Sequence, residues 1–155
     1  MTKLLLILHV LAAVLAVGPV AVAASMFPAS LRAAPGAPDA AGAAAPLRVL
    51  HRICRVYAGV GLAVPLFGFA TASSLGVLGS AWLIASIALT AAAAVVLIVG
   101  ILPGQEAALA AVEEPGAGAP GPPAGRLAMV TGVFNLLWAT VTVLMIVRPG
   151  STTGG

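Results

Sequence analysis

The chain has 155 residues, of which 61% are hydrophobic and only 7% are charged, and its formal net charge is +3. A water-soluble domain carries about 25% charged residues, so this composition argues against a soluble globular domain and indicates an integral membrane protein. The basic balance comes from one lysine and six arginines without a soluble aromatic face, which argues against a nucleic-acid partner. Cys54 is the only cysteine, so the chain forms neither an internal disulfide nor a thiolate metal cluster.

Four apolar segments are long enough to cross a membrane, because about 20 residues at about 1.5 Å each span a hydrocarbon core of about 30 Å. Such segments must satisfy their own backbone hydrogen bonds, so they are helices. The connection between the second and third is short, which favours antiparallel neighbours. The sequence therefore predicts an all-α fold, a membrane-embedded four-helix bundle with antiparallel up-down topology in a single transmembrane domain, 1–155. The predicted helices are 4–27, ended by Pro28; 47–70; 80–102, ended by Pro103; and 127–147, ended by Pro149.

Two low-complexity stretches rich in Pro, Gly and Ala join these helices, at residues 28–46 and 103–125. Such a composition cannot bury a core, so we expect flexible linkers, with room for a short surface helix over 105–114. Residues 149–155 are predicted to be a disordered tail.

Basic residues are unevenly divided between the two ends of this bundle. By the positive-inside rule, the side with more arginine faces the cytoplasm, so both long linkers are predicted to be cytoplasmic and both termini outside. The Ala-, Gly-, Val-, Pro- and Arg-rich composition is typical of a GC-rich bacterial gene, which suggests the bacterial plasma membrane. Arg32, Arg48, Arg52, Arg55 and Arg126 lie on the linker side, and Lys3 and Arg148 on the other.

The first segment also has the features of a signal peptide: a basic start, an apolar centre and Ala21-Val22-Ala23 as a cleavage site. Cleavage there would leave three helices and place Arg48, Arg52 and Arg55 outside, against the charge rule. A first membrane helix therefore remains our prediction, with cleavage as the alternative.

His9 stands alone in the apolar run "KLLLILHVLAAVLAVGP". Small residues share its helix face and leucines occupy the opposite face, so His9 is predicted to point into the bundle. An ionisable group inside a membrane suggests a functional site, here cofactor binding or proton transfer. The favoured interpretation is nevertheless a neutral imidazole that is hydrogen-bonded to a hydroxyl or carbonyl on a neighbouring helix.

A second polar concentration, "LRVLHRICRVYAG", lies at the start of the second helix. Arg48, Arg52 and Arg55 follow one another at i, i+4 and i+7, and His51 is four residues before Arg55. We predict that these four residues contact anionic lipid headgroups or another anionic ligand.

His9 and His51 are predicted to differ in depth by roughly 15–20 Å, at 1.5 Å per residue, so one haem cannot bind both. A haem bound through one histidine, with Met145 as an alternative second ligand, stays open. No Asp or Glu lies in a predicted helix, so we predict no catalytic residues and no metal site.

The stretches "LHVLAAVLAVGPVAVAASMFPASLR", "RVLHRICRVYAGVGLAVPLFGF" and "NLLWATVTVLMIVRP" resemble the helices of CopD-like bacterial membrane proteins, a superfamily with predicted four-helix integral membrane proteins of unknown function. That superfamily also includes copper-resistance membrane proteins and protoporphyrinogen oxidases that use an intramembrane histidine with haem. The resemblance implies a haem ligand at His9, the one matching position. Ala16 stands where these families often have tryptophan.

We therefore expect a non-enzymatic or accessory membrane component. Two alternatives remain, a haem-binding redox protein that uses His9 and a small transporter subunit. Expected partners are the lipid bilayer, including anionic lipids. Small residues on the second and third helices also leave open a homo-oligomer or another membrane protein.

Overall fold

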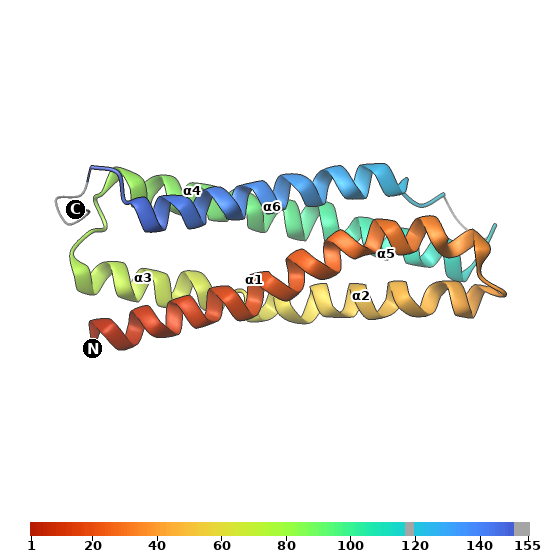
Figure 1. The fold of residues 1–155 in the computed structure, drawn as a ribbon, viewed down its shortest axis with the longest axis horizontal. Coiled ribbons are helices and arrows are strands. Elements are labelled where there is room, and N and C mark those ends of the chain that lie inside the picture. The colour runs from red at the N-terminus through yellow and green to blue at the C-terminus, as the bar shows by residue number, and fades with distance from the viewer. Residues whose placement is uncertain (117–119, 151–155) are drawn as a thin grey trace.

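The computed structural model describes residues 1–116 and 120–150, and over this range the chain folds into four antiparallel helical rods (Figure 1). The rods alternate in direction, so the predicted up-down four-helix bundle is confirmed. All four rods are long and apolar enough to cross a membrane. The predicted tail falls mostly outside the described residues. The rods are α1 (Thr2–Ala33) with η1 (Ala34–Gly36); α2 (Ala40–Val60) with α3 (Ala63–Leu75); α4 (Ala81–Val95), the π-helix η2 (Val96–Ile101) and α5 (Leu102–Glu113); and α6 (Ala124–Val147).

The predicted linker 28–46 is mostly helical, so the expectation of an unstructured linker is wrong there. α1 continues through a buried Pro28 to Ala33, and α2 begins at Ala40. The side chain of Asp39 caps α2 by accepting a hydrogen bond from the backbone N–H of Gly42 at 2.6 Å. Only a few residues therefore separate the first two rods.

The third rod also passes the point where Pro103 was expected to end it. The π-helix η2 directly precedes α5, and Pro103 lies in the first turn of α5. A π-turn widens the helix where the proline ring would otherwise clash with a carbonyl of the preceding turn. α5 is more than a surface helix, because Gln105, Ala108 and Leu109 are buried.

The second rod is broken between α2 and α3. The N–H of Leu62 bonds to the carbonyl of Gly59 and that of Gly61 to the carbonyl of Tyr57. Pro65, four residues after Gly61, has no N–H to offer the Gly61 carbonyl, which accepts from Val64 instead. The break therefore has a local cause in the sequence, and it falls near the middle of the rod.

Buried side chains form two separate clusters. The larger lies where α1, α2, η2, α5 and α6 meet, and it includes Phe27, Leu47 and Phe134. The smaller, at the end of the bundle that carries the termini, joins Ala72, Trp82 and Leu83. The most extensive packing is between α1 and both α2 and α3, between α4 and α6, between α2 and α5, and between α1 and α6.

Candidate functional site

The partner of His9 is a backbone carbonyl. Its Nδ1 atom lies 2.9 Å from the carbonyl oxygen of Val64, in the first turn of α3. A carbonyl only accepts hydrogen bonds, so Nδ1 carries the proton and donates it. His9 thus joins α1 to the second rod directly after the break in that rod.

Gly68 gives the imidazole room to approach α3. A Cβ atom placed on Gly68 would lie 2.8 Å from Cε1 of His9, closer than carbon atoms pack. The predicted inward face of α1 is confirmed, since Ala16, Val20 and Ala23 are buried while Leu11 and Leu15 are exposed. The imidazole is therefore held in a helix–helix contact.

The donation from Nδ1–H to Val64 fixes the tautomer of His9 and leaves Nε2 unprotonated, which is the form in which a histidine ligates a metal. His9 lines neither of the two cavities described below, so neither cavity offers space for a haem beside it. Met145 packs against the small cluster around Trp82. Among the described residues, no three His, Cys, Asp or Glu side chains gather where they could hold a metal ion.

The predicted arginine stripe is on the surface of α2. Arg48, Arg52 and Arg55 are all exposed. Arg48 forms an ion pair with Glu113 of α5. Within the part of the chain that the structure describes, Arg52 and Arg55 have no hydrogen-bond or ion-pair partner, so two of the three guanidinium groups face outward unpaired.

His51, predicted with the arginines as a headgroup or anionic-ligand contact, does not lie on this exposed stripe. It is only 8% exposed, and its Nδ1 lies 3.2 Å from Oε1 of Gln105 on α5. The arginines at 48, 52 and 55 lie on one side of α2, whereas residues 47, 51 and 54 form its buried side. Position 51 therefore turns the imidazole inward.

Sequence reasoning missed the partner of His51. Gln105 is 1% exposed and also donates from Nε2 to the Cys54 sulfur at 3.6 Å. The thiol of Cys54 in turn points to the Val20 carbonyl of α1, 4.0 Å away. Together with the Val20 carbonyl, this His51–Gln105–Cys54 chain connects α1, α2 and α5. Gln105 could have been found from its spacing, because Gln105, Ala108 and Leu109 form one helix face.

A cleft of about 320 Å³ lies at the edge of the larger buried cluster, at the level of the broken rod. All four rods contribute to its walls. Its lining is mostly apolar, with a few polar groups such as the Thr90 hydroxyl and the Tyr57 ring. Tyr57 to Pro65 of the break form one wall, Ala16 to Val20 another, and Thr90 to Ile98 with Phe134 and Trp138 complete it.

Two buried polar atoms on α6 lack hydrogen-bond partners among the described residues, and one of them belongs to Trp138, which lines this cleft. The Nε1 atom of Trp138 and the Oδ1 atom of Asn135 are buried and form no hydrogen bond. The other amide atom of Asn135, Nδ2, donates to Ser25 Oγ at 3.2 Å and so joins α6 to α1. The cleft therefore has a donor in its wall, the indole N–H, that lacks an acceptor.

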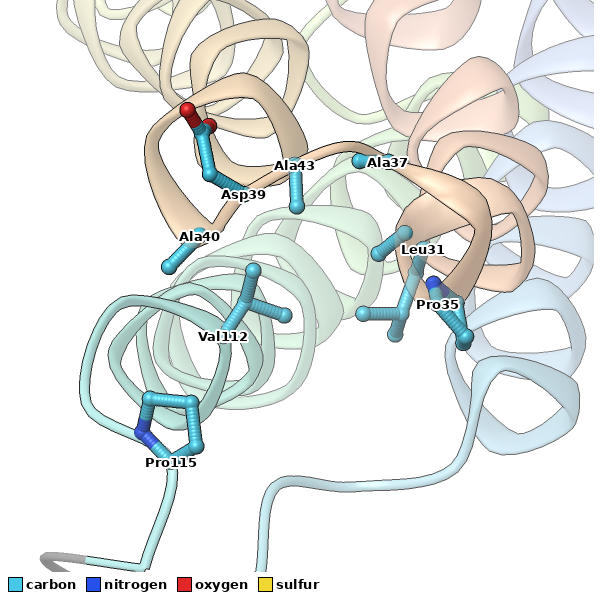
Figure 2. A pocket seen from close by; sticks show the side chains of 9 residues that line it. Leu31, Pro35, Ala37, Asp39, Ala40, Ala43, Val112 and Pro115 are labelled. Atoms are coloured by element: carbon cyan, nitrogen blue, oxygen red, sulfur yellow. The ribbon is translucent and has the colours of Figure 1, made fainter.

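A second cavity, of about 470 Å³, lies at the opposite end of the bundle from the termini, where η1 meets the start of α2 and the end of α5. Figure 2 shows Leu31 and Val112 facing one another across it, with the carboxylate of Asp39 turned away. The Asp39 side chain is already used as the cap of α2. This cavity therefore has apolar walls and no uncommitted polar group among its side chains.

Comparison with models of protein families, with curated proteins and with solved structures finds no match to this chain. Functional inference therefore depends on the geometry of the cleft, the His9 contact and the arginine stripe.

Proposed function

We propose that this chain is a non-enzymatic membrane protein that binds a small apolar molecule from the lipid phase in the cleft between its four rods. The observation that carries this proposal is the cleft at the break of the second rod. Val20, Leu97 and Phe134 belong both to its lining and to the larger buried cluster, so the cleft opens at the edge of the packed core.

The walls define the chemistry of the ligand. A volume of about 320 Å³ is at the lower end of small-molecule sites, which span about 300–1,000 Å³. The small residues Ala58, Gly59 and Gly61 at the break leave the cleft unfilled. Phe134 and Trp138 form the aromatic part of its wall. An acyl chain or a similar apolar body suits such walls, and one hydrogen-bond acceptor on the ligand would pair with the indole N–H of Trp138.

We place the protein in the bacterial plasma membrane with both termini outside. Five arginines at the end with the interhelical connections 34–39 and 114–123, against Lys3 and Arg148 at the other, support this orientation. A fluorescent protein and alkaline phosphatase, each fused after Gly155, test it. Phosphatase activity without fluorescence is expected, and the reverse would refute it.

Lipid extraction tests the binding function. The wild type and two variants are purified in nanodiscs, and organic extracts are examined by mass spectrometry. Gly59→Leu adds bulk to the wall of the cleft at a position where nothing lies within 4 Å of an added Cβ. Gly132→Leu is the matched control, since this helical glycine also has open space but does not line the cleft. A molecule retained by the wild type and the control but absent from Gly59→Leu supports the proposal. Equal extracts from all three would contradict it.

A further inference from the structure

The rods are too long for the hydrocarbon core of a membrane. The first three contain 35, 36 and 33 residues, and at about 1.5 Å each they measure roughly 50 Å. A core of about 30 Å would accept such a rod only at a tilt above about 50°, beyond the 0–40° of membrane helices. Part of each rod must therefore stand outside.

The exposed side chains show where the core ends. Along α2 and α3, large apolar side chains are exposed from Val56 to Leu75, a run of about 28 Å, and Arg55 directly precedes it. On the third rod the last such residue is Val99, and on α6 the first is Met129, three residues after Arg126. On α1 the last such residue is Met26, which the contacts His9–Val64 and Val20–Cys54 place near the level of Val49, itself exposed. The transitions therefore mark a boundary zone that begins at Arg55 and Arg126 and extends to about the level of Arg48.

The helical segments on the arginine-rich side of this boundary have polar exposed faces, as helices in contact with water do. α2 is clearly amphipathic, with Leu47, Leu50 and Cys54 buried and the arginines exposed on the other side. A helix in lipid needs no polar face, whereas a helix at a water boundary does. Between Ala40 and Arg55, Val49 is the one large apolar side chain that is exposed. This end forms a helical extension of up to about 20 Å beyond the core.

We infer that Arg52 and Arg55, at the base of this extension, bind the phosphate group of an anionic phospholipid. They are three residues apart on α2, so their guanidinium groups lie on neighbouring positions of one helix face. Both are exposed, and neither has an ion-pair partner among the described residues. Arg48, one turn further out, is instead neutralised by Glu113. Headgroup phosphates are the anions found at the level of Arg55.

The experiment measures which lipids the full chain retains in nanodiscs that mix phosphatidylglycerol and phosphatidylcholine, by native mass spectrometry. The wild type is expected to retain phosphatidylglycerol preferentially. Arg52→Gln/Arg55→Gln should lower that preference by roughly fivefold or more per arginine, given the usual strength of such contacts. Arg32→Gln is the matched control, because Arg32 is also exposed and unpaired among the described residues but lies about 9 Å beyond Met26, the last exposed large apolar residue of α1.

A second arm separates lipid from free anion. Thermal unfolding is followed in phosphatidylcholine nanodiscs with added inorganic phosphate and, separately, with phosphatidylglycerol. Stabilisation by phosphatidylglycerol alone, lost in Arg52→Gln/Arg55→Gln and kept in Arg32→Gln, supports the inference. Equal losses in both variants, or stabilisation by inorganic phosphate that the double variant removes, would overturn it.

Discussion

The imidazole of His9 donates a hydrogen bond to the backbone carbonyl of Val64, with 2.9 Å between Nδ1 and the oxygen. Val64 directly precedes Pro65. Because Pro65 has no N–H, the Gly61 carbonyl lacks the i+4 hydrogen bond that an α-helix would give it. The histidine therefore attaches α1 to the second rod beside the discontinuity that opens the cleft. We interpret His9 as a support for the cleft wall.

Replacing His9 with phenylalanine tests this support. Phenylalanine keeps a ring of similar shape but removes the donor, and an interhelical hydrogen bond in a membrane protein is worth about 1 kcal/mol. We expect His9→Phe to lower the free energy of unfolding by about that amount. Unfolding in mixed micelles, followed by circular dichroism, measures it. An unchanged free energy of unfolding would show that the bond contributes nothing.

Gly68 should tolerate no side chain while His9 is present. A Cβ at Gly68 would lie 2.8 Å from Cε1 and 3.0 Å from Nδ1 of the imidazole. Gly68→Ala is expected to cost about 1–3 kcal/mol of stability through overpacking. His9→Ala in the same chain should remove most of that additional cost. The control is Gly59→Ala, where nothing lies within 4 Å and alanine favours the helix. Equal effects of Gly68→Ala and Gly59→Ala on the unfolding transition would refute the close contact.

The buried pair of His51 and Gln105 should behave as a unit. Gln105→Leu leaves the His51 ring buried without its partner, which is expected to cost about 1–3 kcal/mol. His51→Leu/Gln105→Leu removes both polar groups and should be closer to the wild type in stability than Gln105→Leu alone. Denaturant unfolding of the wild type, Gln105→Leu, His51→Leu and the double variant completes the cycle. Additive losses in the double variant would speak against the hydrogen bond.

Cys54 should report opening of the helical extension. It is fully buried, so a maleimide reaches its sulfur only when α1, α2 and α5 separate. We expect labelling on the order of 100-fold slower than at an exposed site on the same helix. Ala41→Cys in a Cys54→Ala chain provides that site. Gln105→Ala should accelerate labelling of Cys54, and equal rates at both positions would contradict the packing.

The helix number and the inward face of α1 could be predicted from sequence. The four runs of apolar residues predict the four rods, and the small residues around Ala16 and Val20 indicate which face of α1 packs against the bundle. The last rod ends at Val147 as predicted, because Arg148 precedes Pro149 and a residue before proline disfavours the helical conformation. These features depend on local composition and spacing, which the sequence displays directly.

The extents of the other helices could not be predicted by the same logic. Pro28 and Pro103 predict helix ends, yet α1 continues past the first and a π-helix accommodates the second. The Ala- and Pro-rich composition predicts linkers, although these segments pack together in α2 and α5. The position of His51 depends on Gln105, which is 54 residues away in sequence, so its inward orientation follows from tertiary packing.

The most direct test of a ligand-binding cleft uses the fluorescence of Trp138. Trp82→Phe leaves Trp138, in the cleft wall, as the sole tryptophan. A fatty acid with a nitroxide group on carbon 12 is titrated into nanodiscs that contain this protein. We predict saturable quenching of Trp138 that Gly59→Leu abolishes and Gly132→Leu leaves intact. Quenching that rises without saturation and equally in all three chains would mean that the probe only dissolves in the lipid, and would contradict the proposed function.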